Sequence, residues 1–160
     1  MQEYVPPTPP AFDDDKVRRT LENLIDACLD GEAGFRDAAE HVKDPQLRQY
    51  FADRGRERAR FSVELRRELE RDGHWQSTRE GSVTGALYRT WFDIKRAVGG
   101  GDQAVLDSVE AGEDAARDAY QNALKQPLPP QAMALIRSQA QSILASHDHV
   151  RTLRDRRKAA

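Results

Sequence analysis

Three short breaks constrain what this chain can fold into more than any other feature of its sequence. They are KDP at Lys43–Pro45, GGG at Gly99–Gly101 and QPLPP at Gln126–Pro130. Proline disfavours helical geometry in the residue before it, and a helix does not carry a run of glycines through its interior. The chain is therefore expected to fold as separate segments that end and begin at these breaks.

Between the breaks, apolar residues recur at intervals of three or four, a spacing that places them on one face of a helix. The spacing predicts helices over residues 16–43, 45–72, 83–98, 102–125 and 130–156. The first fifteen residues contain four prolines and end in DDD, so they cannot propagate a helix. We expect a disordered lead over 1–15, one domain over 16–156 and a tail over 157–160.

The order of these segments predicts the architecture. Helices 16–43 and 45–72 would form one hairpin, and helices 102–125 and 130–156 would form a second. The segment 83–98 would lie in the longer connection between the hairpins. This layout is typical of an all-α fold, a ferritin-like antiparallel four-helix bundle with an extra short helix in the crossover.

Composition and charge narrow the functional classes. The 160 residues include 25 basic and 27 acidic side chains, so no net field favours nucleic acid or an anionic membrane as a partner. No segment is apolar enough to span a membrane, and the first residues lack the pattern of a signal peptide, so a cytoplasmic location is expected. Cys28 is the single cysteine and lies at core spacing, which indicates a buried, unreactive thiol.

A repeat draws attention to two glutamates. The sequence GEAGFRDAA at 31–39 is echoed 81 residues later by GEDAARDAY at 112–120, so Glu32 and Glu113 occupy matching places. Both lie within an apolar stripe, and in a bundle they would face one another across the core. An ionised group in a low dielectric needs a positive partner. The two glutamates must therefore bind metal ions, pair with arginines, or lie at a solvent-exposed edge of the bundle.

The metal alternative can be checked against the sequence. Ferritin-like dinuclear centres take one Glu from each of two helices and a Glu-x-x-His pair from each of the other two. Iron or manganese would then be held by Glu32, Glu57, Glu113 and His147. This ligand set is incomplete, because Arg60 stands three residues after Glu57 where the pattern needs histidine, and the helix over 130–156 contains no glutamate.

The arginine alternative uses side chains that the chain does contain. Arg54 and Arg58 fall near the centre of the apolar face of helix 45–72, where they could pair with buried carboxylates. Arginine is always charged and cannot be a metal ligand, so its presence there favours an ionic core without a cofactor. The predicted polar core consists of Glu32, Arg54, Glu57, Arg58, Glu113 and Arg117.

Trp91 lies on a wide aromatic face of the short helix 83–98. Such a face exceeds what a connector needs, so it would either close one end of the bundle or form the contact of a homo-oligomer.

Several longer stretches carry a family resemblance. They are LENLIDACLDGEAGFRDAAEHVKDPQLRQYF, RERARFSVELRRELERDG, GSVTGALYRTWFDIKRAV and EAGEDAARDAY. Together they resemble a bacterial family of uncharacterised ferritin-like four-helix-bundle proteins, known as a domain of unknown function, over about residues 17–155. The residues that match its recurring pattern are Gly31, Glu32, Phe35, Glu57, Arg58, Phe61, Trp91, Gly112, Glu113 and Tyr120.

The resemblance implies a fold and no established activity. The leading functional prediction is a non-enzymatic helical-bundle protein with an Arg/Glu polar core and a stress-associated role. The alternative is a carboxylate-bridged iron or manganese protein with oxidase or storage activity.

Overall fold

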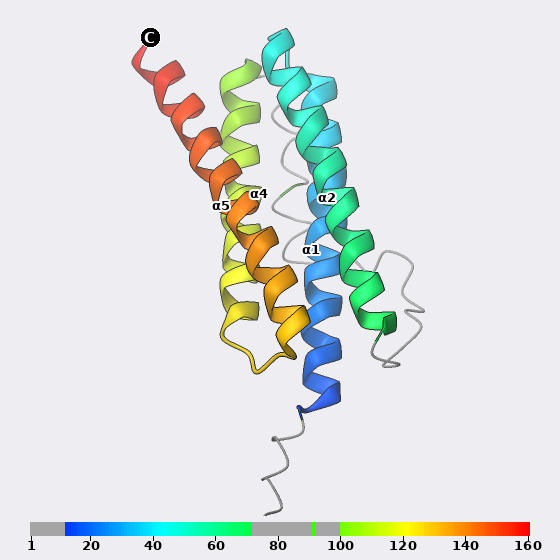
Figure 1. Ribbon diagram of the computed structural model, residues 1–160. Helices are drawn as coiled ribbons and strands as arrows, with labels where there is room; N and C mark the ends of the chain where they lie inside the picture. The colour runs from blue at the N-terminus through cyan, green and yellow to red at the C-terminus, as the bar shows by residue number, and fades with distance from the viewer. Residues whose placement is uncertain (1–11, 72–90, 92–99) are drawn as a thin grey trace, which may run out of the picture.

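A computed structural model describes residues 12–71, Trp91 and residues 100–160. Within these ranges the protein is all-α and contains no strand (Figure 1). The helices are α1 (Asp14–His41), α2 (Pro45–Arg71), α4 (Gly101–Leu124) and α5 (Pro130–Ala159). Of the predicted disordered lead over 1–15, residues 1–11 lie outside the described residues, and Asp14 and Asp15 already belong to α1. The predicted short helix over 83–98 lies outside the described residues except for Trp91.

The predicted breaks end the helices as expected. Val42 takes an extended conformation after α1, and Asp44 opens α2 by accepting a hydrogen bond from the backbone N–H of Gln46 at 2.8 Å. At the N-terminus of α1, the Asp13 carboxylate accepts a hydrogen bond from the backbone N–H of Lys16 at 3.2 Å. Helix α5 continues to Ala159, so most of the predicted tail over 157–160 is helical.

Asp102 connects two elements that are far apart in the sequence. Helix α4 begins one residue earlier, at Gly101, and its cap residue makes no side-chain hydrogen bond. The Asp102 carboxylate instead accepts from the backbone N–H groups of Lys43, at 2.7 Å, and Asp44, at 3.0 Å. The start of α4 is thereby fixed to the turn between α1 and α2.

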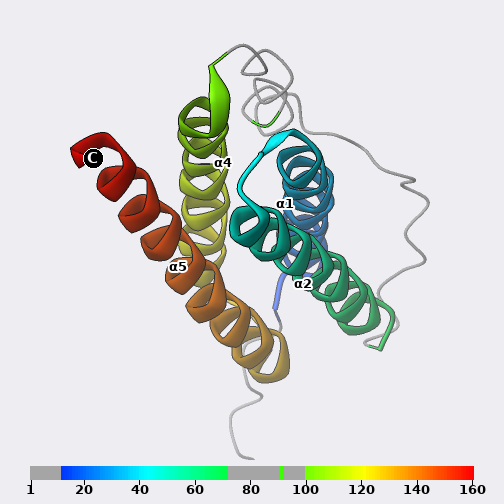
Figure 2. The same cartoon turned by 90° about the horizontal axis from the view of Figure 1, so that it is seen from above.

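The four helices pack side by side at the corners of a bundle (Figure 2). Helix α1 packs along both α2 and α4, and α5 packs along α4. The contact between α2 and α5 is the least extensive of these four. Figure 1 shows the C-terminal end of α5 leaning away from the other helices.

The core consists of two apolar clusters stacked along the bundle. The lower cluster in Figure 1 includes Leu21, Leu65, Leu69, Tyr120 and Ile136, and the upper cluster includes Phe35, Phe51, Leu106, Val109 and Val150. Between the two clusters, each of the four described helices places a small or polar residue. This polar level consists of Gly31 from α1, Arg58 from α2, Glu113 from α4, and Ser146 and His147 from α5.

Trp91 belongs to the upper cluster, and its side chain is only 4% exposed. Its indole lies against Gly34 and Gly112, where a Cβ atom would come within 2.0 Å and 2.3 Å of the ring. The Phe35 ring is 5.1 Å away between centroids. The Trp91 side chain therefore packs in the chain's own core, and the predicted oligomer contact through the helix over 83–98 stays a prediction.

Candidate functional site

The centre of the polar level is an ion pair between Arg58 and Glu113. The Nη2 atom of Arg58 donates to Oε1 of Glu113 at 2.8 Å, and the two side chains are 1% and 0% exposed. The guanidinium also lies over the Phe35 ring, 5.4 Å from its centroid. Two charges that would be expelled singly from an apolar interior are thus held there as a pair.

Gly31 makes room for this arginine. A Cβ atom at position 31 would lie 3.3 Å from Cγ of Arg58, closer than ordinary van der Waals contact. The missing side chain on α1 therefore provides the space into which the arginine of α2 extends.

The environment of Glu113 perturbs its carboxyl group. Burial raises the pKa of Glu113, and the positive charge of Arg58 opposes this shift. The Ser146 hydroxyl and the His147 ring act in the same direction as Arg58. Ser146 also meets the Tyr50 hydroxyl at 3.2 Å, which extends the polar level to the edge of the bundle.

The structure does not bring Glu32 to Glu113. Glu32 is half-buried and lines a groove between α1 and α2. One residue turns a helix by 100°, so with Gly31 facing Arg58 the next side chain points out of the core. The two copies of the sequence repeat also do not occupy matching places in the bundle. Gly112 and Gly34 both lie against the Trp91 ring, whereas Gly31, the sequence match of Gly112, faces Arg58.

Arg54 and Glu57 form a separate pair on α2. Nη1 of Arg54 lies 3.0 Å from Oε2 of Glu57, and both side chains remain partly accessible to solvent. Arg54 also lies over the Tyr50 ring. These two predicted members of the polar core therefore lie at its edge.

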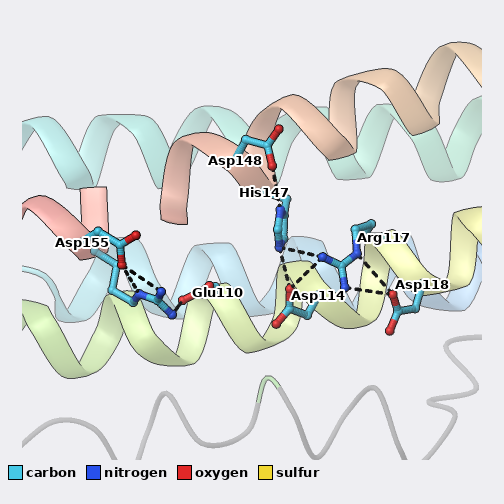
Figure 3. Close-up of polar contacts among 8 residues, drawn as sticks. Glu110, Asp114, Arg117, Asp118, His147, Asp148 and Asp155 are labelled. Atoms are coloured by element: carbon cyan, nitrogen blue, oxygen red, sulfur yellow. Dashed lines mark hydrogen bonds and ion pairs between the residues drawn. The ribbon is translucent and has the colours of Figure 1, made fainter. Parts of the chain in front are cut away.

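Arg117 and His147 meet at a second polar cluster between α4 and α5 (Figure 3). Nε2 of His147 lies 2.5 Å from Oδ1 of Asp114, and Nδ1 lies 3.1 Å from Oδ1 of Asp148. Arg117 pairs with Asp114 and Asp118 and contacts His147 at 3.2 Å. Of the predicted ligands, only His147 belongs to this cluster.

The sequence analysis missed Glu110 and Asp114. Each offers an oxygen to a group with His147 whose three ligand atoms all lie within 4.8 Å of one another. Glu110 is buried and pairs with Arg154. A signal was present in EAGED, because residues four apart share one helix face, but only the structure shows that this face meets His147.

Cys28 lies in another buried hydrogen-bonded chain. Tyr120 donates to Oε1 of Gln139 at 2.7 Å, so the Cys28 thiol, at 3.1 Å, donates to the Tyr120 oxygen. Gln139 in turn donates to Glu64 at 3.0 Å. Burial raises the pKa of Cys28 to about 11, so the thiol stays protonated and unreactive at neutral pH.

A comparison with protein families identifies the chain's relatives. The family described as Domain of unknown function (DUF2383) matches residues 16–126. The chain belongs to this family. The DUF2383 match includes α1, α2 and α4, with the Arg58–Glu113 pair, and ends before α5 and His147. A comparison with curated proteins gives no match. None of the helices in the described part of this DUF2383 protein is long and apolar enough to cross a membrane.

Proposed function

We propose that this DUF2383 protein is a non-enzymatic helical-bundle protein, ferritin-like in arrangement, whose interior holds an ion pair where a ferritin-like relative would hold metal. The observation that carries the proposal is the buried Arg58–Glu113 pair. Arginine stays charged, offers no lone pair to a cation and repels one. The pair would fix which helix faces meet instead of supporting a reaction.

The alternative, a carboxylate-bridged iron or manganese centre, has less support. Its predicted ligands Glu32, Glu57 and Glu113 lie respectively in a groove, against Arg54 and against Arg58. A dinuclear centre at Glu113 would have to expel Arg58 from the core. The stress-associated role, the bacterial origin and the cytoplasmic location remain predictions.

Iron oxidation distinguishes the two functions. We expect that anaerobic loading with Fe²⁺ followed by oxygen gives oxidation at the same rate in the wild type and in Glu113→Gln. Two irons per chain, oxidised rapidly in the wild type and slowly in Glu113→Gln, would contradict the proposal. Glu70→Gln is the matched control, because this glutamate is exposed on α2 and belongs to neither the polar level nor the predicted ligand set.

We also propose that the protein forms a homodimer, with the groove between α1 and α2 as the contact. The groove has a volume of about 680 Å³ and a floor of small side chains from both helices. Its rim carries Arg36, Arg48 and Arg56 together with Glu32 and Glu40. A surface with both signs of charge can pair with itself across a two-fold axis, as a symmetric dimer requires.

Analytical ultracentrifugation tests this contact. We expect Arg36→Glu to weaken the dimer by placing like charges opposite one another, and Arg36→Glu with Glu40→Arg to restore it. Unchanged association in the single variant would remove the groove as the contact, and Lys16→Glu on the same helix provides a charge-matched control outside the groove.

A further inference from the structure

Three metal-ligating side chains, which include neither Arg58 nor Glu113, meet between α4 and α5. Glu110 and Asp114 lie one helical turn apart on α4, and His147 reaches toward them from α5 (Figure 3). Their ligand atoms lie within 4.8 Å of one another, close enough for one ion to bind all three. Glu110 and His147 are buried and Asp114 is accessible, so the cluster has a closed base and an open side.

The histidine is held as a ligand would be. Asp148 contacts Nδ1 at 3.1 Å and leaves Nε2 directed at Asp114. Histidines that bind metal commonly have their other ring nitrogen held by a carboxylate or carbonyl, which fixes the ring orientation. The side chain is only 3% exposed, so the orientation of the ring is also set by packing.

The surroundings of Nε2 make conflicting demands on this nitrogen. An Asp114 oxygen lies 2.5 Å away and requires a proton on Nε2, whereas the Arg117 N–H at 3.2 Å requires a lone pair. One ring nitrogen cannot satisfy both. A cation that receives the lone pairs of Nε2 and of the carboxylate removes the conflict and frees Arg117.

The nearby arginines have other partners. Arg154 contacts Glu110 but also donates through Nε and Nη2 to Asp155, at 3.0 Å and 2.8 Å. Arg117 likewise donates through Nε and Nη2 to Asp118, at 3.2 Å and 3.1 Å. Each arginine can therefore release its carboxylate in the cluster and keep a charge partner. Glu110 and Asp114 together supply two negative charges, which one divalent ion would neutralise.

We propose that Glu110, Asp114 and His147 bind a single divalent transition-metal ion that links α4 to α5. One imidazole nitrogen with two carboxylate oxygens suits Zn²⁺, Mn²⁺ or Fe²⁺ better than Ca²⁺ or Mg²⁺, which take oxygen ligands. Three protein ligands leave a coordination position for water on the open side of Asp114. Arg58 and Glu113 are not among the ligands, and His147 is the residue that the site shares with the polar level.

Calorimetric titration of the full chain with Zn²⁺, after treatment with a chelator, tests the site. We expect one Zn²⁺ per chain and a Co²⁺ adduct with the absorption of a low-coordinate ion. Asp114→Asn should weaken Zn²⁺ at least tenfold. Asp107→Asn is the matched control, because Asp107 lies on α4 with the same 47% side-chain exposure as Asp114 but pairs with Lys158 outside the ligand group, and it should retain binding.

Arg154→Gln provides a second, opposite test. It removes the cation that competes for Glu110, so Zn²⁺ should bind more tightly than in the wild type. Equal losses in Asp114→Asn and Asp107→Asn, or weaker binding in Arg154→Gln, would show adventitious binding by surface carboxylates and overturn the proposal. So would the absence of stoichiometric Zn²⁺ from the wild type.

Discussion

The Arg58–Glu113 pair gives a sharp prediction at the scale of single residues. Removing one partner leaves the other charge buried, so Arg58→Met or Glu113→Leu should each lower the free energy of unfolding by about 3–5 kcal/mol. The double variant Arg58→Met, Glu113→Leu should lose less than the sum of the single losses, because two apolar side chains leave no orphaned charge. Urea denaturation of the four proteins measures this coupling.

The partly exposed pair on the same helix is the control. Arg54→Met should cost less than about 1 kcal/mol, because solvent screens an accessible ion pair. Additive losses at positions 58 and 113 would contradict the coupling of the buried charges.

Asp30 makes stability depend on pH. Burial, and then the neighbouring Asp26, raise the pKa of Asp30 to about 6, from 3.8 in the unfolded chain. Between these values the folded protein binds more protons than the unfolded one, so this group destabilises the fold as the pH rises. Asp30→Asn removes the effect, so its stability relative to wild type should increase as the pH rises from 4 to 7.

Chemical denaturation at a series of pH values between 4 and 7 checks this expectation. If the stability difference between Asp30→Asn and the wild type stays constant across the series, Asp30 does not titrate as described.

Sequence reasoning at this scale reached some side chains and missed others for a physical reason. Helical spacing places Arg58 and Glu113 on core faces, since each lies well inside an apolar stripe. Glu32 lies one 100° step from Gly31, and only the packing of α1 on α2 decides which of the two faces inward. Glu110 meets His147 only because α4 and α5 have a particular axial offset, which no local pattern encodes.

At the scale of elements, two glycines and one tryptophan set how closely α1 and α4 pack. A methyl group at Gly34 or Gly112 would collide with the Trp91 ring, so Gly34→Ala and Gly112→Ala should each cost about 1–3 kcal/mol. Trp91→Leu in the same chain should relieve part of this loss by vacating the space. Thermal unfolding of the single and double variants gives the comparison.

Gly55→Ala is the matched control for these variants. Its Cβ atom would meet its nearest neighbours at 3.5 Å, which is ordinary contact, and alanine is the better helix former. This variant should be neutral or more stable by up to about 1 kcal/mol. A similar loss at all three glycines would indicate a general intolerance of alanine in these helices and not a collision with Trp91.

Helix boundaries were the most predictable property of the elements. Proline and glycine breaks are local signals, and the predicted ends of the four described helices lie within three residues of those observed. The largest error is at the end of α5, where Arg157 pairs with Asp44 and Lys158 pairs with Asp107. Those partners come from distant parts of the chain, so local patterns could not reveal their effect.

At the scale of the whole molecule, α5 completes a core that the family match does not include. The DUF2383 match ends at residue 126, yet α5 buries Ile136, Gln139, Ile143 and Val150. A chain ending at Gln126 would expose the apolar faces that these residues cover. We expect it to lose cooperative thermal unfolding and the near-ultraviolet circular dichroism of a packed core.

Deleting only Ala159 and Ala160, which are exposed, should leave both properties unchanged. A cooperative transition in the chain ending at Gln126 would show instead that α1, α2 and α4 form a self-sufficient core.

The position of the polar level has a consequence for how the molecule comes apart. Arg58 and Glu113 lie where the two apolar clusters meet, so the pair stays dry only while both clusters are closed. If either cluster opened, water would reach the charges, and the apolar side chains of the other cluster that border the ion pair would also become exposed to water. The buried charges therefore couple the two apolar clusters, so that the clusters are expected to unfold together and not one at a time.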